Sequence, residues 1–326
     1  MKKILILVMA MGLLVWSVSS VVGTEKIIIK CTHNGNAAHP FQRGYETFKQ
    51  VLEAETKGAV EVQIFPSEQL GTEEQCAQMI KLGTLDVNIN GTGGLAGFVP
   101  SIELYNLPFI FRDFQHMYRV LDGSIGQKIS KDIETNLDGI FLGYLNSGVR
   151  NAWNSKRPIR TPEDLKGLKI RVMNSPIFVE TWNTLGAQAT PMAFGELYSA
   201  LQQKVVDGAE CDLVDILVEK FYEVTKYVSF TKHMFLPATM VFSKKRYDRL
   251  PADVQKAVMK AARNSVPVER KALETLTDEA LVQLKQKGLE FFDVNQKLFQ
   301  DKVQPVYEKY GERVGGMELI KQVAKQ

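Results

Sequence analysis

The side chains with the clearest chemical potential in this sequence are two arginines, Arg150 and Arg171. Arg171 lies in the segment LKIRV (168–172), where apolar and charged residues alternate, and this pattern predicts a strand with one buried face. Open α/β sheets bind ligands at the carboxyl ends of their strands, and Arg171 is near such an end. Two converging guanidinium groups could hold one carboxylate through planar, bidentate hydrogen bonds. Taken alone, an arginine at such a position is more often part of a structural ion pair, so both interpretations stand at this point.

Residue types suited to catalysis or metal binding show no matching spacing. The sequence has four histidines, and none falls in an HExxH, HxH or Cys/His metal pattern, so we expect surface or structural roles for His116 and His233. We find neither a GxSxG nucleophile elbow nor a GxxxxGK[ST] phosphate loop in the sequence. Acid pairs such as Glu73 and Glu74 fit polar helical faces with solvated charges. We therefore expect neither an enzyme nor a metal site.

One glycine-rich segment, Gly91 to Ala96, follows a predicted strand and fits the G-x-G-x-x-A pattern of dinucleotide-binding proteins. It follows two βα units, whereas the pattern belongs to the first unit, and no acidic residue ends a following strand. We therefore expect no cofactor. The glycines fit a sharp turn or a close approach of the backbone to a ligand.

The chain begins like an exported protein. Lys2 and Lys3 precede an apolar run from Ile4 to Trp16, and small residues follow up to Gly23, which predicts a cleavable signal peptide over residues 1–23. The apolar run is shorter than the roughly 20 residues that cross a bilayer. No cysteine directly follows the run, so a lipid anchor is not expected. We expect a periplasmic protein.

Length and composition indicate a folded protein of two domains. The 326 residues are 45% hydrophobic and 24% charged, and a chain of this length exceeds the usual size of one domain. Loss of Lys2 and Lys3 would lower the formal net charge from +3 to +1, which provides no electrostatic surface for nucleic acid. The three cysteines are Cys31, Cys76 and Cys211, and we expect buried free thiols.

Alternating strand and helix patterns predict an α/β fold with a mostly parallel sheet. The N-terminal part reads as strand, helix, strand, helix and strand, at 26–31, 40–57, 59–65, 72–82 and 85–90. A second region starts near Gly139, and in its segment TPEDLKG Thr161 can cap a short helix. A long helical pattern runs from Pro251 to about Lys287, so this helix should bridge both domains, with a kink at Pro267.

The region from Leu165 through Asp212 resembles the solute-binding proteins of tripartite ATP-independent periplasmic (TRAP) transporters. The resemblance rests on LKGLKIRV and on the run TPMAF, then Y.ALQ, then VVDG. Three further segments carry it over nearly the whole mature chain: FPSEQLGTEEQ at 65–75, LPFIFRDFQH at 107–116, and GVRN with KRPI at 148–159.

The resemblance implies a two-lobed, flytrap-like binding protein with a long helix crossing both lobes. We expect residues 24–147 plus 237–276 in lobe I, and residues 148–236 plus 277–326 in lobe II. Such a protein captures a small organic anion and delivers it to one small and one large integral-membrane subunit that use an ion gradient. We expect a monomer.

The resemblance also implies roles for individual residues. Arg171 would make the main salt bridge to the substrate carboxylate, with Arg150 assisting. Phe194 would pack against the ligand, although a core role remains an alternative, and Asn34 and Thr92 would supply polar contacts from the other lobe.

One position departs from the family pattern, because Cys211 stands where the family often has asparagine. A thiol is a weak hydrogen-bond partner compared with an amide. Either the ligand differs there or the next residue, Asp212, makes the contact.

Two other functions fit an exported binding protein less well. One is a ligand-binding module that feeds a sensor kinase, and the other is a secreted enzyme acting on a carboxylated substrate. The sequence leaves the ligand open among dicarboxylates, sugar acids, hydroxy or keto acids, aromatic acids and sulfonates.

Overall fold

A computed structural model describes residues 26–326, and the signal peptide predicted for residues 1–23 lies outside the described residues. Within the described part, nine strands form one sheet in the order β2-β1-β3-β8-β4-β7-β5-β6, with β9 paired to β8. The strands are β1 Ile27–Thr32, β2 Val60–Phe65, β3 Val87–Gly91, β4 Gly139–Asn154, β5 Lys169–Val172, β6 Gln188–Pro191, β7 Gly208–Cys211, β8 Tyr227–Ser243 and β9 Glu290–Phe292.

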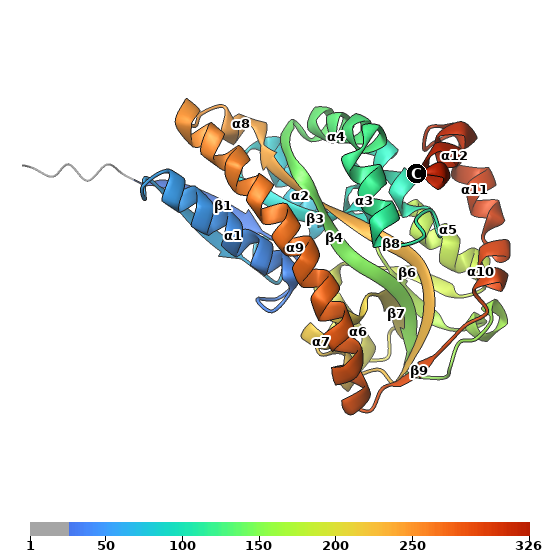
Figure 1. Cartoon of the computed structure of the whole chain (residues 1–326). Helices are drawn as coiled ribbons and strands as arrows, with labels where there is room; N and C mark the ends of the chain where they lie inside the picture. Colours follow the sequence, from blue (N-terminus) through green and yellow to red (C-terminus); the bar gives the residue numbers. More distant parts are fainter. Residues whose placement is uncertain (1–25) are drawn as a thin grey trace, which may run out of the picture.

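Helices surround this sheet, as Figure 1 shows. They are α1 Pro40–Glu55, α2 Glu73–Leu82, α3 Phe114–Asp122, α4 Ser124–Leu137, α5 Pro176–Leu185, α6 Leu197–Gln202, α7 Leu213–Val218, α8 Lys244–Tyr247, α9 Ala252–Gln286, α10 Gln296–Lys302, α11 Gln304–Tyr310 and α12 Gly316–Lys325. Short 3₁₀ turns occupy Thr92–Leu95, Pro100–Asn106, Pro162–Leu165, Phe194–Glu196 and Phe221–Glu223.

Two long strands join the two halves of the sheet. β4 and β8 run antiparallel to each other and are 16 and 17 residues long. The carboxyl end of β8 pairs with β3, whereas the carboxyl end of β4 pairs with β7. The short strands outside this pair, β1 with β2 and β3, and β5 with β6 and β7, are parallel. The expectation of a mostly parallel sheet therefore holds for the flanks and fails at the centre.

The long helix α9 packs on both halves of the molecule (Figure 1). Its first half contributes Val258 and Ala261 to a core with α1, β1 and β2. Its second half contributes Ala280 and Leu284 to a separate core with β7 and α6. The predicted long helix that crosses both lobes is thereby confirmed, with 35 residues and with Pro267 inside it.

Local sequence signals explain where several elements begin. Thr72 and Gln75 form a reciprocal capping box at the start of α2, and Gly83 ends that helix in the left-handed conformation. The Nδ1 of His39 accepts the Phe41 N–H at the start of α1. The segment after Thr161 also forms a capping box, but it closes a single 3₁₀ turn.

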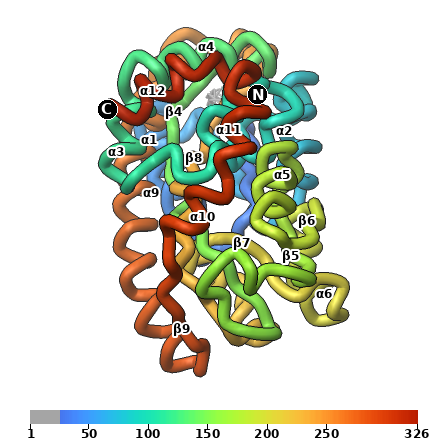
Figure 2. The backbone as a smooth tube through the Cα atoms, turned by 90° about the vertical axis from the view of Figure 1, so that its right-hand side faces the viewer, coloured from blue at the N-terminus to red at the C-terminus, as the bar shows by residue number. Residues whose placement is uncertain are grey.

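The C-terminal helices return to the first part of the chain, as the red segment in Figure 2 shows. The Nε2 of His116 in α3 donates to the Val323 carbonyl of α12 at 2.8 Å, and Arg112 donates to the Ala324 carbonyl. His116 is thus a buried structural residue, as expected. Among the described residues, no helix is long and apolar enough to cross a membrane.

Candidate functional site

Arg171 is a buried guanidinium with one edge occupied by backbone. Arg171 follows Ile170 in β5, an inner strand between β6 and β7. Arg171 is only 2% exposed and Ile170 is fully buried, so both faces of the strand are covered at this point. Its Nε and Nη2 donate to the Met192 carbonyl at 3.0 and 2.7 Å. Within residues 26–326 it forms no ion pair with an acidic side chain. A guanidinium has five N–H donors, so the opposite edge can still receive an anion.

The surroundings of Arg171 make an anion favourable there. Burial, together with the positive charge of Arg150, lowers the pKa of Arg171, although Glu210 opposes this shift. The guanidinium lies 5.8 Å from the ring centre of Phe194, which itself packs edge-on against Phe221. Phe194 therefore contributes both to the core and to the surroundings of the arginine.

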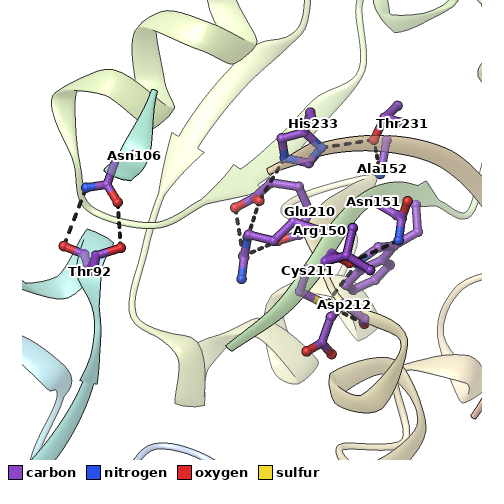
Figure 3. A network of polar contacts seen from close by, with 12 residues as sticks. Thr92, Asn106, Arg150, Asn151, Ala152, Glu210, Cys211, Asp212, Thr231 and His233 are labelled. Atoms are coloured by element: carbon purple, nitrogen blue, oxygen red, sulfur yellow. Dashed lines mark hydrogen bonds and ion pairs between the residues drawn. The ribbon is translucent and has the colours of Figure 1, made fainter. Parts of the chain in front are cut away.

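Arg150 has a dedicated acidic partner (Figure 3). Its Nε and Nη2 donate to the Glu210 carboxylate at 2.5 and 2.9 Å, and Nη2 also donates to the Glu210 carbonyl. Burial alone would lower the pKa of Arg150, but Glu210 outweighs burial and raises it. His233 faces the same carboxylate at 3.2 Å, and burial lowers the pKa of this imidazole. The charge of Arg150 is thus compensated inside the protein.

A small enclosed cavity brings both arginines together with residues from the other half of the sheet. It is lined by Asn34, His39, Phe41, Glu73, Ser147, Arg150, Arg171, Met173, Phe194 and Asp215. Its volume is about 10 Å³, which is roughly the space that one water molecule needs. An organic acid can therefore enter only if the two lobes move apart or side chains shift.

Glu73 is a site residue that sequence reasoning missed. We expected a solvated charge, but Glu73 is 8% exposed and lines the cavity. Burial raises the pKa of Glu73 to about 8, and its Oε1 accepts the Gly91 N–H at 2.8 Å. It is the first residue of α2, which follows the parallel strand β2, so its place at the carboxyl edge of the sheet was a usable signal.

The glycines near Glu73 permit a close approach between segments. A Cβ on Gly94 would lie 2.9 Å from the Glu73 Cβ, and a Cβ on Gly93 would lie 2.9 Å from the sulfur of Met173. These glycines therefore let the turn after β3 contact both α2 and the segment after β5. This is the close backbone approach that the glycine-rich segment suggested, made here to protein side chains.

His39 and Asp215 are two further cavity residues that sequence reasoning missed. They come from opposite halves of the sheet, and the His39 Nε2 lies 3.5 Å from the Asp215 Oδ1. Asn34, in contrast, was expected at the site and does line the cavity.

Three expected site residues do not line this cavity. The Cys211 sulfur accepts the Trp153 indole N–H at 3.2 Å inside a hydrophobic core. Asp212 caps α7, where its Oδ1 accepts the Asp215 N–H at 2.6 Å. The hydroxyl of Thr92 donates to the Asn106 Oδ1 at 2.7 Å, away from the arginine network in Figure 3. All three side chains contact protein groups in this conformation.

The three cysteines are buried free thiols, as expected. In the part of the chain that the structure covers, no group of histidines, cysteines or acids could hold a metal ion. A larger hollow of about 820 Å³ lies on the outer surface between α3, α4 and α9. Its Arg270 is already paired with Asp122 and with the Tyr144 carbonyl, so this hollow has no comparable buried and unpaired charge.

Comparison with known proteins identifies the family. The profile of the family described as "Bacterial extracellular solute-binding protein, family 7" matches residues 31–313. The chain belongs to this family. Family 7 proteins include the periplasmic binding proteins of TRAP transporters, so the resemblance seen in the sequence is confirmed.

Individual relatives of this family 7 protein differ in what they bind. The 2,3-diketo-L-gulonate-binding periplasmic protein YiaO of Escherichia coli (strain K12) is 32% identical, over 81% of this chain and 84% of its own.

Two solved TRAP periplasmic solute-binding proteins have the same fold. The one from Polaromonas sp. JS666, bound to D-erythronate, is 34% identical with a TM-score of 0.88 over 91% of this chain and 98% of its own. The one from Sulfurospirillum deleyianum DSM 6946, bound to succinate, is 30% identical with a TM-score of 0.88 over 92% and 98%. This family 7 protein therefore has the two-lobed α/β fold of the TRAP periplasmic solute-binding proteins.

Proposed function

We propose that Arg171 is the anion clamp with which this protein captures a small organic acid between its two lobes. The observation that carries the proposal is the free edge of a buried guanidinium that has no acidic partner among the described residues. A carboxylate on that edge would form two parallel charge-assisted hydrogen bonds. Closure of the lobes excludes water and strengthens these bonds.

The other cavity residues take supporting roles. Arg150 is held by Glu210, so it assists with its remaining Nη1 donors and with its positive field. Phe194 covers the clamp, and Asn34 offers a polar contact from the first lobe. Asp212 helps to position the lining residue Asp215, because its side chain accepts the Asp215 N–H at the start of α7. Cys211 and Thr92 make their contacts to Trp153 and Asn106, outside the cavity lining.

The charges around the cavity favour an acid with a single carboxylate and several hydroxyl groups. Among the described residues that line the cavity, Arg171 is the one arginine without an acidic partner, because Glu210 compensates Arg150. Glu73 and Asp215 also line the cavity, and they suit ligand hydroxyls better than a second carboxylate. D-Erythronate and 2,3-diketo-L-gulonate, which two relatives bind, have this chemistry.

Delivery of the acid completes the proposed function. As a family 7 protein, it would act in the periplasm after cleavage of its leader and hand the acid to small and large membrane subunits of a TRAP transporter. It would bind the acid without chemical conversion, since the cavity residues include no nucleophile paired with a base.

A thermal-shift screen of the purified mature protein tests the proposal. Ligand at 100 times its dissociation constant stabilises a protein by about 2.7 kcal/mol. We expect D-erythronate and D-glucuronate to raise the melting temperature, and neutral sugars to leave it unchanged. A screen in which only neutral sugars or cations act would refute the anion clamp. A larger shift with succinate would refute only the single-carboxylate part.

A further inference from the structure

A hydrogen bond joins the segments that follow the two terminal strands of the sheet. β2 and β6 are the terminal strands in the sheet order, so they belong to opposite lobes. Glu68 lies in the turn after β2, and its Oε2 accepts the Gly195 N–H, just after β6, at 3.0 Å. Gly195 follows Phe194, whose ring lies against the Arg171 guanidinium. This hydrogen bond therefore connects the two lobes directly beside the anion clamp.

The turn that contains Glu68 has a strained backbone conformation. Ser67 and Glu68 have φ values of 55° and 54°, a backbone conformation that side chains other than glycine rarely adopt. The Ser67 N–H donates to the Gly35 carbonyl at 2.7 Å, and the Glu68 N–H donates to the His33 carbonyl at 3.2 Å. These two bonds anchor the turn to the segment after β1.

On the opposite side of the contact, Gly195 leaves room for the carboxylate. A Cβ added to Gly195 would lie 2.6 Å from the Glu68 Oε2, so the carboxylate would have to move away. Within the described residues the second carboxylate oxygen, Oε1, is buried and accepts no hydrogen bond, and burial raises the pKa of Glu68. The hydrogen bond to the Gly195 N–H is therefore the contact that joins the Glu68 side chain to the second lobe.

A second bridge lies elsewhere between the lobes. The Asn36 N–H donates to the Glu219 Oε1 at 2.8 Å, and its side-chain amide donates to the Val218 carbonyl at 2.6 Å. Asn36 follows β1, and Val218 ends α7. The closed arrangement is therefore held by polar contacts from at least two pairs of segments.

We propose that Glu68 is a closure residue: its carboxylate clasps Gly195 when the lobes meet and so slows the release of bound acid. Glu68 does not line the cavity, so it acts on the ligand through the lobes. Only the predicted effect on ligand release depends on the function proposed above. The contact itself can be tested without any ligand.

Hydrogen exchange at the Gly195 amide, measured on the full mature protein, reports the clasp directly. In Glu68→Ala the amide loses its acceptor, and we expect exchange to be about tenfold faster. Glu68→Gln retains a side-chain oxygen that accepts the same N–H, so exchange should stay within about threefold of the wild type. Unchanged exchange in Glu68→Ala would overturn the proposal.

Two further variants separate the clasp from simple charge effects. Glu74→Ala removes a neighbouring acid that makes no hydrogen bond to the second lobe in the described structure, and it should leave Gly195 exchange unchanged. Gly195→Ala should release ligand as fast as Glu68→Ala, because its Cβ displaces the carboxylate. In the double variant the two effects should not add, and full additivity would contradict a shared contact.

The effect on ligand is measured with D-glucuronate as the probe, by stopped-flow fluorescence. We expect Glu68→Ala to speed release about tenfold and to change association less than about twofold. An unchanged release rate would overturn the role in release. If D-glucuronate does not bind, the ligand class proposed above fails, and Gly195 exchange alone still decides whether the clasp exists.

Discussion

Replacing Arg171 with lysine should weaken acid binding strongly while leaving the fold intact. In the structure one edge of the guanidinium holds the Met192 carbonyl, and the opposite edge is available to a carboxylate. A lysine ammonium has no fixed fork, so it cannot serve the carbonyl and both carboxylate oxygens together. Loss of one charge-assisted hydrogen bond costs about 1.5 to 3 kcal/mol. The dissociation constant should therefore rise about 10- to 150-fold.

Isothermal titration calorimetry with the tightest acid from the thermal-shift screen measures this change. The matched control is Arg157→Lys, because Arg157 also donates to main-chain carbonyls, those of Asp164 and Lys166, but lies exposed and outside the cavity. The Arg157→Lys variant should bind the acid with the affinity of the wild type. If Arg171→Lys binds the acid as tightly as the wild type, with an unchanged circular dichroism spectrum, the anion is held elsewhere and the clamp is refuted.

Three further outcomes follow from buried groups. Arg150→Met should lower the free energy of unfolding by about 3 to 5 kcal/mol in urea titrations, because it leaves Glu210 buried without its partner; a loss below about 1 kcal/mol would contradict the charge compensation. Burial raises the pKa of Glu269 to about 8, so the folded protein retains a proton that the unfolded chain releases. Wild-type stability should then fall as pH rises from the ordinary glutamate range towards 8, by at most about 1.4 kcal/mol per unit from this group. Glu269→Gln should remove this component and be more stable than the wild type at pH 8, whereas parallel pH curves would contradict it. The three cysteine thiols should react with Ellman's reagent only after unfolding in guanidinium chloride, and rapid reaction of the native protein would show that a thiol is accessible.

Much of the fold could be predicted because its local patterns are strong. The strand alternation of LKIRV and the helical pattern over 72–82 are local signals, and the structure has β5 and α2 where they predict. The long helix after Pro251 could be predicted for the same reason, because its helical pattern continues without a break to about Lys287. The central antiparallel pair was less visible, because the pairing of β4 with β8 joins segments far apart in the chain.

The site could be predicted only in part. Arg171 was recognisable from its strand end, but the compensation of Arg150 by Glu210 depends on residues 60 positions apart in the chain. Glu73 looked solvated because its helix is polar locally, and only packing against the turn after β3 buries it. Position 211 looked like a ligand contact, yet its thiol faces an indole in a core that no local pattern reveals.

The shared strands β4 and β8 limit how this protein can move and how it can fail. Because each strand belongs to both lobes, opening must bend the hydrogen-bonded pair of strands. The bending raises the elastic energy of the sheet and so opposes opening. The lobes also cannot melt one after the other without breaking that strand pairing, so heating should produce a single calorimetric transition. A destabilising substitution in either lobe is then felt by the whole molecule. For the same reason, one lobe cannot be exchanged with that of a relative as an independent module.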